Sequence, residues 1–515
     1  MNNMQSSRTY NSIMNSIVGI FSSVVTIILN FIVRIVIVRV LGEEINGIHN
    51  LFQSITNVVA LIEAGFSTAM VIHLYKPIKE EDHDTTKAMM SFYNKIYVRI
   101  ALIYAVVCIL INIFVIQYLV VSSIPILQVR IYFAIYTLIT PFSYLTYHKT
   151  SILFAEQKNR VRIAVVTASE FVFRTLQIVS VIMLKQYYVF LVLLILEKIT
   201  CNVISGKYVD KRHKYLKEKN SVEISDGTKS FIYSKVKSIF VNNVSSNVQT
   251  SAKSILISIL LGNVSVVGYF GNYQLVIGSA QLLFSQFGGA FTSSFGNLAV
   301  EGNKEHMYQV YRKTAFIFGS IAIILCAGFI SCIQTFILMF FGERFLLSLS
   351  SVIILTSGMY VYLLYVPIIS IQNALGLHNK DQVVMVIQAI VAVVLGYLFG
   401  LKFGMDGILL GLLLPEFICT LVNKGVVINK AAFNKPTKYF LRFLCYEIFK
   451  GIVVVFSCYF ISLHINTGSL ALDLLLKGLV AIMVSLLLLF FLSFKSQYFK
   501  DTVAMTKNII RSKFV

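Results

Sequence analysis

The sequence predicts an all-α polytopic membrane protein with about 14 transmembrane helices, and three features of the chain carry that prediction. Hydrophobic residues make up 57% of the 515 residues and charged residues only 13%, about half the charged share of a soluble domain. Apolar stretches of about 20 residues recur along the chain, and each is long enough to cross about 30 Å of hydrocarbon as a helix. Strands of a membrane barrel would be about half as long and would alternate in polarity, so helices are expected.

Fourteen segments have this character, and their limits follow from where the apolar residues end. The chain starts with polar residues, and its first apolar stretch is too long for the core of a cleaved signal peptide. We therefore expect the first stretch to be a span. The predicted spans are 13–40, 47–74, 96–121, 124–147, 163–184, 187–206, 237–261, 264–295, 314–341, 349–375, 383–401, 405–427, 439–463 and 470–493.

The charges in the predicted loops indicate the orientation. An even number of spans places both termini on one side of the membrane. If that side is the cytoplasm, the outer loops hold only Lys185, Arg344 and Lys402, whereas the inner loops and tails hold about thirty Lys and Arg. We therefore expect a protein of the cell membrane whose two termini both face the cytoplasm. The net charge of +21 then reflects topology and attraction to lipid, and we expect no nucleic-acid partner.

The longest polar stretch divides the predicted spans into two sets. Residues 1–206 form an N-terminal six-helix lobe, and residues 207–236 form a cytoplasmic linker. A second six-helix lobe follows in residues 237–427, and residues 428–515 supply two extra helices and a basic cytoplasmic tail.

Short motifs recur between the two lobes at an offset of about 220 residues. Gly42 lies at the end of the first span and Gly47 opens the second, and Gly262 and Gly268 have the same places at the seventh and eighth. Each lobe has an even number of spans, so both lobes begin on the same side. Such repeats are related by an axis along the membrane normal, with the substrate path between them.

Polar side chains form a stripe along the first span and a second stripe along the seventh. Steps of three and four residues place each stripe on one helix face. The first stripe ends in Arg34 and the second in Lys253, at the same place in the repeat. We expect the stripes, with fainter ones in the second and eighth spans, to line a cavity through Ser23, Thr26, Asn30, Asn50, Asn57, Asn242, Ser245, Gln249, Gln274 and Gln281.

The two terminal cations decide between two interpretations of the stripes. Hydrogen bonds that join helices account for the neutral polar residues. They do not account for two cations, because a charge near the middle of the bilayer costs about 3 kcal/mol on insertion scales. A cavity for an anionic substrate requires such charges. We therefore predict that Arg34 and Lys253 bind an acidic headgroup.

Other embedded charges have two interpretations each. Glu63 either pairs with Arg34 or takes up a coupling proton or sodium ion. Glu170 and Arg174 stand four residues apart, so they either neutralise each other or line the path. Arg130 either lines the path or anchors its helix near the outer surface.

The remaining polar residues do not form a catalytic or metal site. The chain has no phosphate-binding Gly-x-x-x-x-Gly-Lys loop and no His-Glu-x-x-His motif, so we expect no enzyme, no cofactor and no metal. All seven cysteines lie in apolar segments and predict buried thiols. Lys424 and Lys450 lie near predicted inner ends, where we expect them to reach the membrane surface.

Five segments are similar to the turns and loops of a known family: residues 34–48, 61–69, 75–78, 92–97 and 154–159. They resemble the Wzx-type polysaccharide flippases, members of the superfamily that also holds multidrug exporters and lipid II flippases. The resemblance implies two six-helix lobes with two extra helices. It also implies an undecaprenyl-pyrophosphate-linked oligosaccharide as substrate for capsule or exopolysaccharide synthesis, moved to the outer leaflet by alternating access.

The resemblance further implies a cationic central cavity that holds the pyrophosphate, which fits Arg34 and Lys253. It implies a polysaccharide polymerase and glycosyltransferases as partners. Three alternatives remain. A lipid II flippase differs in the sugar that it carries, and a cation-coupled multidrug exporter favours acids and aromatics for cationic drugs. A membrane-embedded polysaccharide polymerase needs large outer loops, whereas the predicted outer loops are short.

Overall fold

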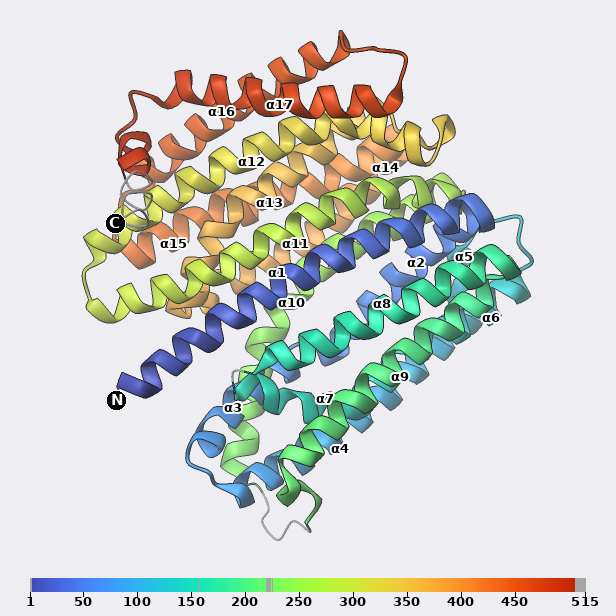
Figure 1. Cartoon of the computed structure of the whole chain (residues 1–515), viewed down its shortest axis with the longest axis vertical. Helices are drawn as coiled ribbons and strands as arrows, with labels where there is room; N and C mark the ends of the chain where they lie inside the picture. The colour runs from blue at the N-terminus through green and yellow to red at the C-terminus, as the bar shows by residue number, and fades with distance from the viewer. Residues whose placement is uncertain (1, 157, 219–223, 225, 505–515) are drawn as a thin grey trace. The chain divides into compact units, whose positions relative to one another are not determined.

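A computed structural model describes residues 2–156, 158–218, 224 and 226–504, and this part of the chain contains helices and no strands (Figure 1). The chain forms two compact units, Met1–Gly271 and Asn272–Val515. Within the described residues, eleven helices are long and apolar enough to cross a membrane. The predicted all-α polytopic fold is therefore confirmed, while the orientation of the termini remains a prediction.

The first unit contains the helices α1 (Asn2–Val36), η1 (Ile37–Leu41), α2 (Glu43–Val59), η2 (Ala60–Glu63), α3 (Phe66–Lys79), α4 (His83–Leu110), η3 (Ile111–Val115), α5 (Ile116–Leu119), α6 (Ile126–Thr137), α7 (Ile139–Ala155), α8 (Asn159–Leu184), α9 (Tyr187–Arg212), η4 (Lys214–Lys217) and α10 (Asp226–Leu261). The first eight residues of α11 (Val264–Glu301) also belong to it.

The second unit contains the rest of α11, followed by α12 (Lys304–Phe340), η5 (Glu343–Phe345), α13 (Leu349–Leu375), η6 (Leu377–Lys380), α14 (Gln382–Pro415), η7 (Glu416–Asn423), α15 (Lys424–Phe433), α16 (Thr437–Leu463) and α17 (Leu470–Ser493). The predicted extra helices are α16 and α17, which pack against α12 and against each other.

Three differences explain why the structure has eleven apolar helices where the sequence predicted fourteen spans. The long run Gln382–Phe433 counts as one helix, but Gly404 has non-helical angles (φ 58°, ψ −134°) and divides it between the predicted spans 383–401 and 405–427. The predicted second span is split into α2 and α3 by η2 and by Gly65, whose φ is 99°. The third difference is α10, whose polar stripe lowers its mean hydropathy.

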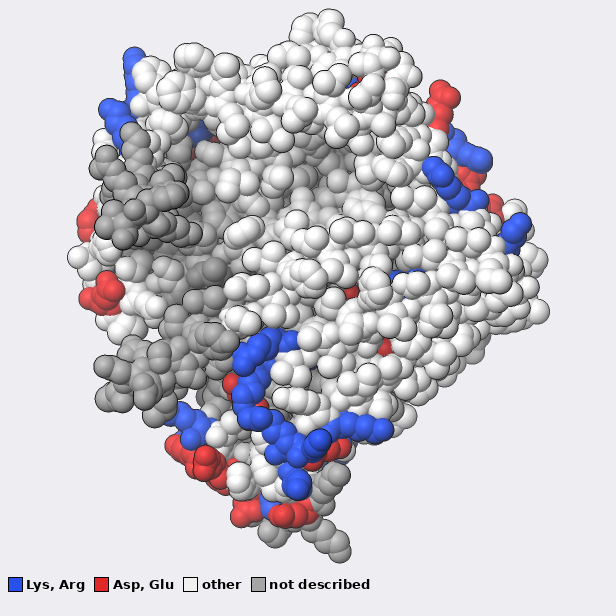
Figure 2. Space-filling view, in the orientation of Figure 1, with Lys and Arg blue, Asp and Glu red and all other residues white. Residues whose placement is uncertain are grey.

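The outer faces of the helices are apolar because they are solvated by lipid and not by water. Figure 2 shows the exposed middle of α8 and α9 almost free of charge, whereas Lys and Arg gather near the start of α8. The core of the first unit is apolar as well: Ile, Leu, Val and Met side chains pack there with the fully buried Tyr93, Tyr97 and Tyr104. A core and outer faces that are both apolar are typical of a protein that is surrounded by hydrocarbon.

The unit boundary differs from the predicted lobe boundary. Helix α9 continues to Arg212 and α10 begins at Asp226, so the connection is shorter than the predicted linker 207–236. The structure also groups α10 and the start of α11 with the first unit, whereas the predicted second lobe begins at residue 237. Helix α10 packs along α2, which explains this grouping.

Lys424 and Lys450 do not reach the membrane surface, so that prediction is wrong. Lys424 is buried, and its Nζ lies 3.0 Å from Oδ2 of Asp381. Lys450 is fully buried, with its Nζ 2.7 Å from Oε1 of Glu447. In each case a carboxylate within the unit neutralises the cation, so the side chain has no need to extend to water.

An ion cluster joins the end of α7 to the end of α9. The carboxylate of Glu156 lies 3.4 Å from Nζ of Lys158, 3.3 Å from Nε of Arg212 and 3.4 Å from Nε2 of His213. Burial raises the pKa of Glu156, but the hydrogen bond from His213 and the neighbouring cations outweigh burial and lower this pKa to about 2. The cluster therefore holds the loop between α7 and α8 in place.

Candidate functional site

The candidate site is built around Arg34, in the last turn of α1. Its Nη1 donates hydrogen bonds of 2.6 Å to Oδ1 of Asn46 and to Oδ1 of Asn50. These two amides stand four residues apart on α2, so they lie on one face of that helix. Asn46 is 0% exposed and Asn50 is 7% exposed. In the described part of the chain no carboxylate forms an ion pair with Arg34, so its positive charge is held by neutral dipoles.

Hydrogen-bonding groups remain available beside this contact. A guanidinium has five N–H donors, and the bonds to Asn46 and Asn50 use only those of Nη1. A guanidinium only donates, so the oxygen of Asn50 must face Arg34, and its Nδ2 is buried without a partner among the described residues. Donors gathered around an uncompensated cation are suited to an anion.

Glu63 does not pair with Arg34, and that alternative is wrong. Its carboxylate lies at the end of η2, where Oε1 accepts a 3.4 Å hydrogen bond from the hydroxyl of Tyr97. Thirteen residues separate Glu63 from Asn50, which corresponds to about 20 Å along a helix and explains the missing pair. No cation lies within ion-pair distance of Glu63 among the residues that the structure describes.

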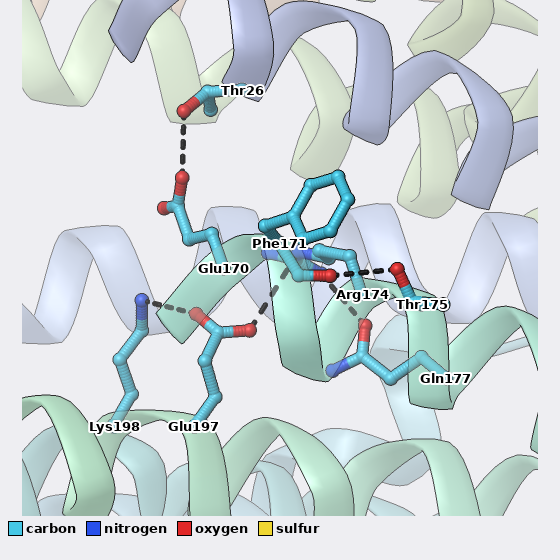
Figure 3. A network of polar contacts seen from close by, with 8 residues as sticks. All are labelled: Thr26, Glu170, Phe171, Arg174, Thr175, Gln177, Glu197 and Lys198. Atoms are coloured by element: carbon cyan, nitrogen blue, oxygen red, sulfur yellow. Dashed lines mark hydrogen bonds and ion pairs between the residues drawn. The ribbon is translucent and has the colours of Figure 1, made fainter. Parts of the chain in front are cut away.

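The predicted pair of Glu170 and Arg174 is also not formed (Figure 3). Oε2 of Glu170 accepts a 2.6 Å hydrogen bond from the hydroxyl of Thr26 on α1. Nε of Arg174 lies 3.7 Å from Oε2 of Glu197 on α9, and Nζ of Lys198 lies 2.9 Å from Oε1 of Glu197. Glu197 is 1% exposed, so a buried acid on the neighbouring helix replaces the local partner that sequence spacing indicated.

The stripe on α1 has a mixed role in the structure. Ser23 donates to the carbonyl oxygen of Gly19 in its own helix, and Thr26 joins α1 to α8. These contacts fit the alternative in which polar residues hold helices together. Asn30 is half-buried and Asn57 exposed, and neither has a hydrogen-bond partner among the described residues. Both remain predicted cavity residues.

Lys253 lies on α10, half-buried, with no hydrogen bond or ion pair to any residue that the structure describes. Helix α10 packs along α2, the helix that carries the amides bound to Arg34. No hydrogen bond between described residues joins Lys253 to Arg34 itself. Of the other predicted residues, Gln249 is buried, Gln274 and Gln281 are half-buried in the second unit, and the side chains of Asn242 and Ser245 lie outside the described part.

Arg130 anchors α6. Its Nη2 donates 3.0 Å hydrogen bonds to the carbonyl oxygen of Ile113 and to Oε1 of Gln117, in η3 and α5. The side-chain Nδ2 of Asn112 donates a 3.2 Å hydrogen bond to the backbone carbonyl oxygen of Arg130. These contacts favour the anchoring interpretation over a place in the path.

Sequence reasoning missed Asn46, which completes the site. Asn46 lies one residue before the predicted second span 47–74, so it was not counted in the stripe of that span. One signal was present: Asn46 and Asn50 stand one helical turn apart, next to Gly47, in the segment that carries the family resemblance.

Comparisons with known proteins identify solved structures that have a similar fold. No family model matches the chain, and no curated protein matches it. The lipid II flippase MurJ in an inward closed conformation matches with a TM-score of 0.66 and 16% identity, over 95% of this chain and 100% of MurJ. An inward-facing multidrug resistance MATE family transporter of the MOP superfamily matches with a TM-score of 0.59 and 15% identity, over 79% of this chain and 96% of that protein.

A third match is a MOP superfamily transporter from Pyrococcus furiosus, whose description reports a reversed polarity of the binding pocket. Its TM-score is 0.57 at 13% identity, over 83% of this chain and 97% of that one. Identities this low concern the fold alone. The chain therefore has the fold of a MOP superfamily transporter, with many membrane-spanning helices.

Proposed function

We propose that this chain is a flippase of the cytoplasmic membrane that moves an undecaprenyl-pyrophosphate-linked oligosaccharide from the inner to the outer leaflet. The observation that carries the proposal is Arg34, a cation inside a membrane protein that two neutral amides hold and no described carboxylate neutralises. An embedded charge without a counterion is costly, so it marks the place where an anion binds during the cycle.

In this mechanism the pyrophosphate binds the guanidinium of Arg34 through N–H groups that have no partner in the described structure. The second cation is Lys253, whose helix packs along α2. Polar side chains of the stripes accept and donate hydrogen bonds to sugar hydroxyls, while the polyprenyl tail stays in lipid. Alternating access then exposes the headgroup to the other side.

The membrane potential supplies part of the driving force. A pyrophosphate diester carries about two negative charges, and each gains about 2.3 kcal/mol per 100 mV when it moves away from a negative interior. Coupling to an ion is the second source, with Glu63 as the candidate. Its carboxylate lies at the break between η2 and α3, without a described cation partner, where a proton or sodium ion can bind.

A lipid II flippase is the second candidate, because the match to MurJ covers 95% of this chain, against about four fifths for the MATE transporters. Both candidates carry a polyprenyl pyrophosphate and differ in the sugar. A multidrug exporter for cationic drugs is disfavoured by the uncompensated charge of Arg34. Partner glycosyltransferases and a polysaccharide polymerase follow from the first candidate.

The test is transport by purified protein in liposomes that contain a fluorescent undecaprenyl-pyrophosphate-linked saccharide. Chemical quenching of the outer leaflet measures how much probe has crossed. The variants Arg34→Gln and Lys253→Gln should each slow the transfer, and the double variant should abolish it. The control is Lys477→Gln, which removes a half-buried cation of the second unit that binds Thr335 on α12.

Wild-type rates in the control and none in the double variant would support the proposal. Transfer at the wild-type rate in the double variant would refute the assignment. Running the assay with lipid II as the probe distinguishes the two candidates, because the preferred sugar gives the faster transfer.

A further inference from the structure

The starts of α2 and α11 cross in backbone contact within the first unit. A Cβ atom on Gly47 would overlap the carbonyl oxygen of Val264, so no larger residue fits there without a shift. A Cβ atom on Gly268 would lie 3.0 Å from the backbone nitrogen of Gly47. Gly47 and Gly268, two of the four glycines that mark the sequence repeat, are therefore the ones that let the two helices touch. By the predicted topology this contact lies toward the outer side.

Asn46 connects this contact to the anion site. Its Oδ1 accepts from Nη1 of Arg34 at 2.6 Å, and its Nδ2 donates to the carbonyl oxygen of Gly268 at 3.2 Å. One fully buried amide thus bonds the guanidinium on α1 with its oxygen and the backbone of α11 with its nitrogen. The orientation of this amide is determined, because a guanidinium cannot accept and a carbonyl cannot donate.

Asn50 reinforces the arrangement from the next turn. Its Oδ1 binds the same nitrogen of Arg34, and a Cβ atom on Gly271 would overlap its side-chain amide. The donor Nδ2 of Asn50 is left buried without a described partner, next to the cation. A buried donor without a partner costs free energy that an anion oxygen would recover.

We infer that Asn46 and Asn50 are positioning residues that hold the Nη1 side of the Arg34 guanidinium, so that its Nε and Nη2 edge faces a pyrophosphate. Because Asn46 also bonds α11, this orientation of the guanidinium depends on the α2–α11 contact. The inference rests on the proposed function. While the contact is closed, the guanidinium is preorganised and affinity for the anion is high. When α11 moves away, Asn46 loses its second bond, the guanidinium is freed, and the anion is released.

Thermodynamic linkage makes the effect reciprocal. If closure of the α2–α11 contact raises the affinity for pyrophosphate, a bound pyrophosphate must stabilise that contact by the same factor. Coupling between sites is typically 5- to 150-fold. An anion bound at Arg34 should therefore protect the backbone amides of residues 264–271 from exchange with solvent.

The experiment measures both sides of this linkage on the full chain in detergent, with undecaprenyl pyrophosphate as the probe. Binding is titrated, and hydrogen–deuterium exchange of the peptide 264–271 is followed with and without the probe. In the wild type the probe should slow exchange at this peptide. In Asn46→Ala, affinity should fall about tenfold and the probe should no longer change exchange there. A purely structural role would change the basal exchange without removing the response to the probe.

Two further variants complete the test. The matched control is Gln53→Ala, an exposed amide on α2, which should bind and respond like the wild type. In Asn46→Asp a carboxylate would pair with Arg34, so the fold should survive and binding of the probe should be lost. If Asn46→Ala keeps wild-type affinity and the response at 264–271, the inference is overturned while the proposed function stands. If Arg34→Gln binds the probe like the wild type, the proposed function itself fails.

Discussion

Replacing Lys450 by Met should severely destabilise the second unit, because it leaves a buried carboxylate without its cation. Lys450 and Glu447 are both 0% exposed, and their charged atoms lie 2.7 Å apart, one turn apart on α16. Nζ of Lys450 also lies 4.7 Å from the ring centre of Phe316 and 4.9 Å from that of Tyr446. The pair therefore lies between protein side chains, away from lipid headgroups and water.

The magnitude follows from how closely α12 encloses the carboxylate. A Cβ atom on Gly319 would lie 2.5 Å from Oε2 of Glu447, so there is no room for water to replace the lost cation. Removing one partner of a buried pair costs about 3–5 kcal/mol, whereas replacing both by apolar residues of similar volume is often neutral or stabilising. We therefore expect Lys450→Met to lose about 3–5 kcal/mol and Glu447→Leu with Lys450→Met to recover most of it.

The assay heats detergent-solubilised protein and measures the monodisperse fraction by size-exclusion chromatography. A loss of this size should lower the apparent Tm by roughly 6–20 °C for a unit of about 240 residues. The matched control is Lys495→Met, which removes an exposed lysine and should leave the Tm unchanged. A double variant that is as unstable as Lys450→Met would refute the reasoning, because the loss would then come from packing and not from the unpaired charge.

Three further predictions concern other contacts. Gly47→Ala should cost about 1–3 kcal/mol and slow transport in liposomes at normal membrane insertion, because the new Cβ atom collides with the Val264 carbonyl; wild-type transport would contradict this. The pKa of Glu156 is held at about 2, so its stabilisation is complete above about pH 4.5 and is lost as the pH falls through 2. Between about pH 5 and 3, the Tm should therefore fall further in the wild type than in Glu156→Gln, and equal losses would argue against the ion cluster. Lys424→Met should lower the Tm, because it leaves the buried carboxylate of Asp381 without its cation. Adding Asp381→Asn removes that charge and should restore the Tm. A double variant that is as unstable as Lys424→Met would show that the lost ion pair does not cause the loss of stability.

The sequence by itself determined the class of the fold and the position of the first candidate cation. Hydropathy and segment length are properties of single helices, so the fourteen segments could be located before any contact between helices was known. Gly404 lies at the turn predicted between the spans 383–401 and 405–427, whereas the break at Gly65 lies inside the predicted span 47–74 and was not indicated. Arg34 was identified for the same local reason, because it ends a stripe with helical spacing.

Only the tertiary structure decided which partner each charge meets. Spacing along α8 favoured a pair between Glu170 and Arg174, but the rotation of α9 brings Glu197 to Arg174 instead. The role of the Asn46 amide, which bonds Arg34 on α1 and Gly268 on α11, follows only from the packing of these helices against α2. Periodicity specifies a face of one helix, whereas a contact depends on the rotation and register of two, and those are set by packing across the whole unit.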